Sequence, residues 1–295
     1  MSKKKLNFAF FGSSKFSLDI LKVLKKNKFT PSLVVTTPDR PAGRGQTIAP
    51  TPVKVWAEEN SVPTFQPLDY KEDSINKLKS LNPKRTEEWD FFIVASYGSI
   101  LPEKVISMPN FKSLNVHPSL LPKLRGSSPI ESAILREKET GVTIMRMDER
   151  MDHGPILTQK KVFYKNWPPD APTLEKDLAK EGALLSIKTI PLWINGEIEE
   201  KPQNEKEATY TTMIKKSDAL LDIENEKPEF LYSKIKAYKD RFKPYFFIST
   251  PENKQMRIIV TEAELSNGKL LIKRVVPEGK KETDYQEFMQ KINRG

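Results

Sequence analysis

Two stretches decide the fold and the chemistry: residues 113–130, SLNVHPSLLPKLRGSSPI, and residues 140–157, TGVTIMRMDERMDHGPIL. In the first, Asn115 and His117 lie two positions apart in a short apolar run, so on a β-strand both side chains point to the same face. Proline and glycine then break the strand into a turn. The second stretch supplies Asp152 after an alternating strand pattern. An amide, an imidazole and a carboxylate at neighbouring strand ends suit an acyl-transfer site.

The three residues alone also allow a plainer interpretation. Asn115 and His117 can form a hydrogen-bonding pair at a strand end, and Asp152 is a common turn former. A pattern of Asn, any residue and His is weak by itself. The surrounding sequence therefore has to decide between the two interpretations.

The rest of the first two thirds predicts an α/β fold. Apolar runs at 6–11 and 32–37 flank a helical pattern at 16–26, which gives a β-α-β opening and a parallel, Rossmann-like sheet. The run at 91–96 is the most apolar and predicts a central strand buried on both faces. Further helices are expected at 53–60, 69–81, 129–137 and 173–195, and further strands at 141–147 and 155–162. No Gly-x-Gly-x-x-Gly pattern is present, which disfavours a dinucleotide cofactor.

Composition indicates a globular protein with a basic surface. The 295 residues are 37% hydrophobic and 30% charged, with a formal net charge of +10 and a pI near 9.4. That charge favours a polyanionic partner without naming one. The sequence has no cysteine, which excludes disulfides and thiolate metal sites. Gly12 cuts the first apolar run, so we expect no signal peptide, and no later run is long enough to span a membrane.

Two segments place basic residues where they can meet a nucleic acid. The loop 38–52 carries Arg40 and Arg44 and is longer than the roughly 2 to 6 residues usual in α/β units. The segment 232–243, YSKIKAYKDRFK, interleaves basic and aromatic residues, which suits phosphates and bases. The alternatives are a solvated loop and an amphipathic helix with a solvated basic face. The basic residues predicted to bind in the second segment are Lys234, Lys236, Lys239, Arg241 and Lys243.

The sequence resembles the folate-dependent formyltransferases, most of all the branch that acts on methionyl-tRNA. The two opening stretches carry most of the resemblance. It extends to FAFFGSSKFSLDILKVL at 8–24, TTPDRPAGRGQTIAPTPVKVWAEE at 36–59 and VASYGSILP at 94–102, all in the order found in the family. This context favours the catalytic interpretation of Asn115, His117 and Asp152.

The resemblance implies a reaction: a formyl group passes from 10-formyltetrahydrofolate to the methionine amino group on initiator tRNA. We expect Asn115 to hold the formyl carbonyl, His117 to donate to the developing oxyanion, and Asp152 to orient His117 and manage the protons. No metal is needed. The family also implies that folate binds at the SLLP segment through its backbone and that Tyr97 walls the pterin pocket. The four segment residues are Ser119, Leu120, Leu121 and Pro122. Tyr97 can alternatively be a core aromatic.

The resemblance further implies how tRNA is held. The loop with Arg44 matches the family's Gly-Arg-Gly tip, which enters the acceptor stem, although Gln46 and Thr47 stand where a basic pair is common. The family's C-terminal domain is a small, OB-like β-barrel, here shortened. We therefore expect a catalytic domain at 1–195, a linker at 196–208 and a tRNA-binding barrel at 209–295.

Three other functions remain open at this stage. An amino sugar nucleotide formyltransferase would share the three catalytic residues, and a folate-dependent deformylating hydrolase is a further relative. A non-catalytic RNA-binding protein on the same scaffold is the rival of a different class. We expect a cytoplasmic monomer. His153 is interpreted as an exposed bystander, and the sequence leaves open whether Arg125 faces the folate tail or the tRNA.

Overall fold

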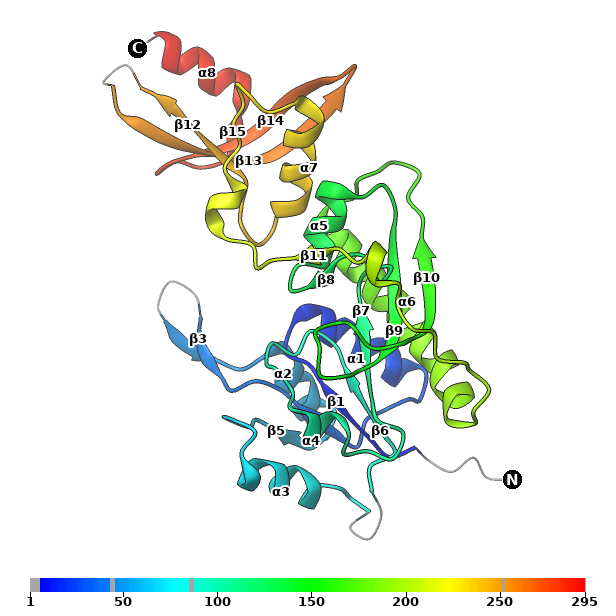
Figure 1. Cartoon of the computed structure of the whole chain (residues 1–295). Coiled ribbons are helices and arrows are strands. Elements are labelled where there is room, and N and C mark those ends of the chain that lie inside the picture. Colours follow the sequence, from blue (N-terminus) through cyan, green and yellow to red (C-terminus); the bar gives the residue numbers. More distant parts are fainter. Residues whose placement is uncertain (1–5, 43–45, 85–87, 251–252, 295) are drawn as a thin grey trace. The chain divides into compact units, whose positions relative to one another are not determined.

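The computed structural model describes residues 6–42, 46–84, 88–250 and 253–294 (Figure 1). The chain divides into two compact units. Unit 1 comprises Met1–Gly126, Thr140–Val162 and Glu175–Tyr210, and unit 2 comprises Ser127–Glu139, Phe163–Leu174 and Thr211–Gly295. In the part of the chain that the structure describes, no helix is long and apolar enough to cross a membrane.

Unit 1 is built on a seven-stranded sheet in the order β10-β9-β7-β6-β1-β2-β5. The five strands from β7 to β5 are parallel, and β9 and β10 continue the sheet antiparallel. The strands are β1 (Phe8–Phe11), β2 (Leu33–Val35), β5 (Thr64–Phe65), β6 (Phe91–Val94), β7 (Ser113–His117), β9 (Thr140–Arg146) and β10 (Ile156–Val162). The parallel, Rossmann-like sheet that the sequence predicts is confirmed.

The helices of unit 1 follow the periodicity of their apolar residues. They are α1 (Lys15–Lys26), α2 (Pro52–Glu59), α3 (Glu72–Ser80), α4 (Glu103–Ile106) and most of α6 (Ala171–Ile194). The hydroxyls of Ser14 and Thr51 cap α1 and α2 by accepting from the backbone N–H groups of Ser17 and Lys54. Such caps satisfy N–H groups that the first turn leaves without partners.

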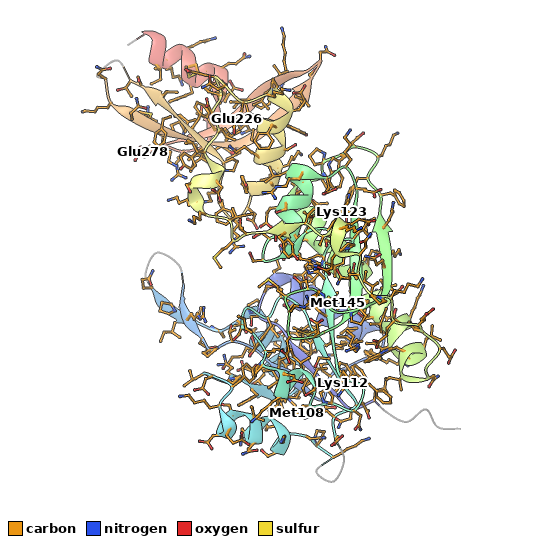
Figure 2. All side chains as sticks on the ribbon, in the orientation of Figure 1. Met108, Lys112, Lys123, Met145, Glu226 and Glu278 are labelled. Carbon is orange, nitrogen blue, oxygen red and sulfur yellow. The ribbon has the colours of Figure 1, made fainter. Side chains whose placement is uncertain are left out.

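The core of unit 1 lies against both faces of the sheet. On one face, side chains of β1, β2 and β6 pack with Ile75 and Leu78 of α3 and Val105 and Ile106 of α4. Near β7 and β9 the helix α6 comes so close that a Cβ on Gly182 would lie 2.6 Å from Val116. Figure 2 shows the interior side chains, among them Met145 of β9, which is 1% exposed. This packing holds β7 rigidly in place.

The predicted loop 38–52 contains a small two-stranded ribbon. Its strands are β3 (Arg40–Ala42) and β4 (Thr47–Ala49), which pair antiparallel. The residues 43–45 that join them, including Arg44, lie outside the described residues. The ribbon was missed because its three-residue strands are mostly polar or proline-containing and carry no alternating pattern.

Unit 2 contains a four-stranded antiparallel sheet in the order β12-β13-β14-β15. The strands are β12 (Tyr245–Ser249), β13 (Gln255–Ser266), β14 (Lys269–Pro277) and β15 (Thr283–Asp284), and the helices are α5 (Pro129–Arg136), α7 (Pro228–Tyr238) and α8 (Tyr285–Arg294). Leu231 and Ile235 of α7 and Phe288 of α8 share one core with the sheet. The predicted α/β sheet domain followed by a C-terminal β domain is confirmed. A shortened, OB-like β-barrel was expected for the second part, whereas its described strands form an antiparallel sheet with β12 and β15 at its two edges.

Two helix starts differ from their predictions. The helix α6 begins at Ala171 instead of residue 173, and the Asp170 carboxylate caps it by accepting from the Thr173 N–H at 3.0 Å. The helix α7 spans Pro228–Tyr238. It therefore begins four residues before the predicted basic segment 232–243 and ends inside that segment. Proline at the first helical position explains the earlier start, since its fixed φ suits a helix and it lacks an N–H that would stay unpaired.

Candidate active site

The strand β7 presents Asn115 and His117 on one face of the sheet. It runs between β6 and β9, with Asn115 opposite Val94 on one side and Met145 on the other. Strand neighbours on both sides fix the backbone, so the two side chains have a defined direction. His117 is 4% exposed, and Asn115 is half-buried.

The carboxylate of Asp152 joins this pair. Its Oδ1 accepts from Asn115 Nδ2 at 3.0 Å, and its Oδ2 accepts from the Gly126 N–H at 2.8 Å. His117 Nδ1 lies 3.5 Å from the same Oδ1. The structure thus brings the three predicted catalytic residues together, although Asp152 is 35 or more positions from the other two. Asp152 has a left-handed backbone, with φ of 51°.

His117 has an oxygen atom beside each ring nitrogen. Nε2 lies 3.0 Å from the Leu124 carbonyl, which can only accept, so Nε2 carries a proton. Nδ1 faces the Asp152 carboxylate oxygen Oδ1 at 3.5 Å. The Leu124 carbonyl and the Asp152 carboxylate therefore fix the direction of the imidazole ring from two sides.

Three residues adjoin this site without having been predicted to do so. The sequence did not indicate Gln203 or Glu205, and it did not decide which way Arg125 faces. Arg125 is 1% exposed and pairs with Glu205 through Nη1 at 3.1 Å and Nη2 at 2.7 Å. Gln203 bonds both Arg125 and the Asp152 carbonyl. The hydrogen bond to Glu205 raises the pKa of Arg125, and the same bond lowers the pKa of Glu205. Arg125 thus faces the protein interior, and no sequence pattern could indicate partners nearly 80 residues away.

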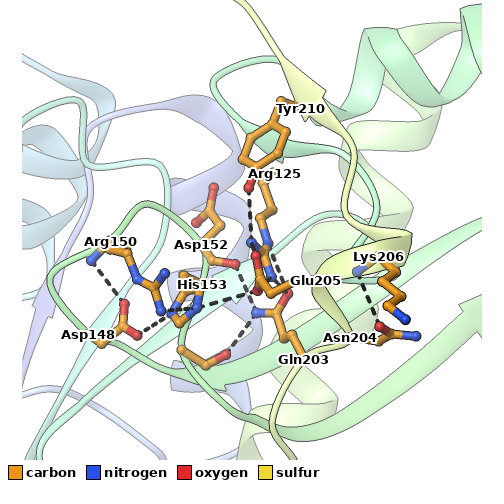
Figure 3. A network of polar contacts seen from close by, with 11 residues as sticks. Arg125, Asp148, Arg150, Asp152, His153, Gln203, Asn204, Glu205, Lys206 and Tyr210 are labelled. Atoms are coloured by element: carbon orange, nitrogen blue, oxygen red, sulfur yellow. Dashed lines mark hydrogen bonds and ion pairs between the residues drawn. The ribbon is translucent and has the colours of Figure 1, made fainter.

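His153 is not an exposed bystander. Its side chain is 20% exposed, and Nδ1 donates to Asp148 Oδ2 at 2.6 Å. Its Nε2 contacts Arg150 Nη2 and lies 3.4 Å from Glu205 Oε1 (Figure 3). The prediction was wrong because the turn after β9 folds back onto residues 203–205, a contact that local sequence does not reveal. His153 therefore helps to hold the loop that carries Asp152.

The SLLP segment uses much of its backbone inside the protein. The Ser119 carbonyl accepts from Thr143 Oγ1 at 2.6 Å, and the same Oγ1 accepts from the Leu121 N–H at 3.1 Å. The Leu121 carbonyl accepts from Gln159 Nε2 at 2.7 Å, and Ser119 Oγ donates to the Lys123 carbonyl. Leu120 and Pro122 are half-buried. Ser119 and Leu121 are buried, so the surface that this segment offers a ligand lies at Leu120 and Pro122.

Tyr97 lies in the core of unit 1. It is 3% exposed, packs edge-on against Phe11 and shares a 2.6 Å hydrogen bond between its hydroxyl and that of Tyr70. Burial raises the pKa of both phenols. This is the core-aromatic alternative, with the hydroxyl paired inside the protein instead of at the surface.

The predicted tRNA-binding residues differ in exposure and in whether their charges already pair with a carboxylate of the protein. Arg40 at the start of β3 is exposed, as are Lys239, Arg241 and Lys243, although Lys239 lies 3.4 Å from Asp170. Lys234 is 12% exposed and its ammonium lies 2.9 and 3.0 Å from the two Glu226 oxygens. Lys236 lies over the Tyr232 ring. Arg44 lies outside the described residues.

Among the residues that the structure describes, no cluster of His, Asp and Glu could hold a metal ion. The groups that converge at the site are Asn115, His117, Asp152 and the backbone N–H of Gly126. These groups can bind a carbonyl oxygen and move a proton without forming a covalent intermediate.

Comparison with known proteins gives consistent results. Residues 4–189 match the model of the formyl transferase family. The chain is 43% identical to a methionyl-tRNA formyltransferase of Thermotoga maritima over 80% of this chain and 74% of that protein. It is 37% identical to one of a Sulfurihydrogenibium species over 87% of this chain and 81% of that one.

A solved structure shares the fold at lower identity. The N-formyltransferase of Helicobacter canadensis, in complex with folinic acid and dTDP-3-aminofucose, is 21% identical, with a TM-score of 0.63 over 89% of this chain and 88% of that one. The residue geometry, the family match and the relatives agree, and the chain belongs to the formyl transferase family.

Proposed function

We propose that the protein transfers the formyl group of 10-formyltetrahydrofolate to the amino group of methionine on initiator tRNA. The observation that carries the proposal is the triangle of Asn115, His117 and Asp152, intact in a chain about 40% identical to methionyl-tRNA formyltransferases. The exposed basic side chains near the end of α7 and on β3 fit a polyanionic acceptor.

The reaction needs a neutral amine, a group that binds the formyl oxygen and a path for one proton. The amine nitrogen attacks the formyl carbon, the carbon–N10 bond of the folate breaks, and the amine proton ends on N10. Asp152 accepts one N–H of the Asn115 amide, which fixes the direction of the amide. The second N–H of that amide is then available to the formyl oxygen as it becomes negative.

His117 and Asp152 serve the proton transfer. In the geometry described here the His117 ring donates to the Leu124 carbonyl, so direct donation from His117 to the formyl oxygen requires the ring to leave that partner. The shorter path is for the imidazole–carboxylate pair to take the amine proton and return it to N10, directly or through one water. We propose that Asp152 orients His117 and manages the protons, as the sequence predicts.

The folate is expected to meet side chains more than backbone. Ser119 and Leu121 use their main-chain groups internally, so Leu120 and Pro122 offer apolar contact to the pterin. We propose that Tyr97 contributes to the pterin pocket from the core, where its hydroxyl shares a hydrogen bond with that of Tyr70.

The proposal also covers how tRNA is held, the oligomeric state and the division into domains. We propose that tRNA is held by Arg40, Arg44, Lys239, Arg241 and Lys243, with Lys234 and Lys236 supporting the helix α7. The chain would act as a cytoplasmic monomer. A catalytic domain at 1–195, a linker at 196–208 and a tRNA-binding domain at 209–295 remain our functional division. The compact units suggest one refinement, since residues 127–139 and 163–174 group with the C-terminal unit.

Single-turnover formylation of methionyl-tRNA from 10-formyltetrahydrofolate tests the proposal, with wild type, Asn115→Ala and Arg44→Ala compared. We expect wild type to formylate, Asn115→Ala to lose about 100- to 1000-fold in rate, and Arg44→Ala mainly to need more tRNA. Folate binding should survive in both variants, which separates chemistry from unfolding.

Two results would overturn the acceptor or the activity. A wild type that binds folate and leaves methionyl-tRNA unchanged, yet formylates an amino sugar nucleotide, places the chain with the sugar enzymes. Release of free formate instead would identify a deformylating hydrolase. A wild type that binds tRNA but no folate would identify a non-catalytic RNA-binding protein.

A further inference from the structure

The side chain of Gln203 makes four hydrogen bonds, two on each side of its amide. Its Nε2 donates to the main-chain carbonyls of Asp152 and Gly154, both at 2.8 Å. Its Oε1 accepts from Arg125 Nε at 3.1 Å and Nη2 at 2.8 Å. An amide has two N–H donors and two acceptor lone pairs, so the group is fully used (Figure 3).

The residue that Gln203 holds needs support. Asp152 has φ of 51°, a left-handed conformation that residues with a Cβ adopt only at a cost in free energy. Such a backbone persists when the surrounding structure fixes it. Gln203 binds the main-chain oxygen of Asp152 itself and that of Gly154, so it spans the turn in which the left-handed residue lies.

Arg125 anchors Gln203 and also supports the carboxylate end of Asp152. Its guanidinium is almost fully buried and is fixed by the paired bonds to Glu205. The next residue, Gly126, donates its N–H to Asp152 Oδ2 at 2.8 Å. Arg125 and Gly126 therefore reach Asp152 by two routes, one to its main chain through Gln203 and one directly to its carboxylate.

We propose that Gln203 is a positioning residue for formyl transfer, which fixes the Asp152 main chain so that its carboxylate meets Asn115 and His117. The proposal rests on the proposed function for its kinetic readout. Gln203 lies in the segment after α6, which the sequence predicted to be a linker. The proposal therefore makes this segment part of the structure that positions Asp152.

Kinetics of Gln203→Ala test the proposal, with Asn204→Ala as the matched control. Asn204 is exposed, lies in the same segment and bonds Lys206 and Glu207 instead of the Asp152 turn. We expect kcat of Gln203→Ala to fall about 10- to 100-fold, since small misplacements of a catalytic group carry costs of that order. KM for both substrates should stay within about twofold, and Asn204→Ala should match wild type.

The variant Gln203→Glu separates positioning from general stability. An ionised carboxyl group still accepts from Arg125 but faces two carbonyl oxygens with no hydrogen to donate. Its kcat relative to wild type should therefore be low at pH 8 and rise as the pH is lowered and the carboxyl group gains a proton. A residue that served stability alone would show no such pH-dependent ratio.

Amide hydrogen exchange in residues 147–155 tests the same point without catalysis. Exchange there should quicken in Gln203→Ala and stay at the wild-type rate in Asn204→Ala. If wild type fails to formylate methionyl-tRNA, the proposed function fails and the exchange result still decides the positioning role. Wild-type kcat in Gln203→Ala, or unchanged exchange with a kcat that merely follows lowered thermal stability, would overturn the proposal.

Discussion

The two oxygens of the Asp152 carboxylate each have their own donor. Asn115 Nδ2 approaches Oδ1 and the Gly126 N–H approaches Oδ2, at 3.0 and 2.8 Å. A group with two acceptor oxygens is needed, because an amide would place its own N–H groups against one of these donors. The shape of the site thus selects a carboxylate over its closest isostere.

Asp152→Asn tests this selection. We expect kcat to fall by at least about 100-fold, since the amide cannot take a proton and releases Asn115 from its orientation. The unmatched donors should also lower the free energy of unfolding by about 1 to 3 kcal/mol. Turnover and denaturant unfolding measured on one preparation check both effects. Near wild-type turnover would show that the carboxylate takes no part in the chemistry.

The hydroxyls of Tyr70 and Tyr97 form a buried pair whose ionisation opposes folding. Burial raises both pKa values above the ordinary 10.0, so the folded protein keeps protons that the unfolded chain loses. The stabilising effect is complete below pH 10 and is lost as the pH rises further. We expect Tm to fall more steeply above pH 10 in wild type than in the double variant Tyr70→Phe with Tyr97→Phe. Equal slopes would contradict a buried phenol pair.

At the scale of elements, the contact of α6 with β7 and β9 sets where β7, the strand that carries Asn115 and His117, lies. Gly182 faces Val116 and Val142 so closely that an added Cβ would lie 2.6 and 3.0 Å from their methyl groups. Valine side chains have few alternative rotamers, so the helix or the strand has to shift.

Gly182→Ala therefore has two opposing effects on the free energy of unfolding. Alanine favours the helix by about 1 kcal/mol over glycine, whereas overpacking costs about 1 to 3 kcal/mol, so we expect a net loss of stability. Because Val116 lies between Asn115 and His117, kcat should fall as well. Lys180→Ala, on an exposed position of the same helix, should leave both quantities near wild type. If Gly182→Ala were more stable than wild type, the contact of α6 with Val116 and Val142 would have space for a methyl group, and the prediction would be wrong.

At the scale of the whole molecule, the net charge of +10 favours a polyanionic partner, and the structure separates exposed charges from those paired within the protein. Arg241 and Lys243 are exposed, whereas the Lys234 ammonium is held by Glu226. A phosphate contact releases counterions, and each contact adds about 0.7 to 0.9 to the salt slope of binding.

The double variant Arg241→Ala with Lys243→Ala should bind tRNA more weakly and with a salt slope lower by about 1.4 to 1.8. Lys234→Ala should lower Tm and leave the slope unchanged, because its charge already serves an internal ion pair. Binding titrations at several salt concentrations measure the slopes. An unchanged slope in the double variant would remove these two residues from the tRNA surface. The monomeric state stays a prediction, which sedimentation would check.

The sequence by itself predicted the longer strands and helices of unit 1 and singled out Asn115, His117 and Asp152, but it did not predict the short elements β3, β4, β5 and α4. Apolar runs with periods of two and 3.6 record which faces are buried, and that information is local. The spacing of Asn115 and His117 placed them on one face for the same reason.

Only the tertiary structure decided which groups complete the site. Gln203, Glu205 and Arg125 come together across 78 to 80 residues, and His153 meets Glu205 through a turn that folds back. Hydrogen bonds between distant side chains leave no periodic trace in the sequence, because they depend on where the backbone has already been placed. The burial of Arg125 and the left-handed backbone of Asp152 are consequences of that placement.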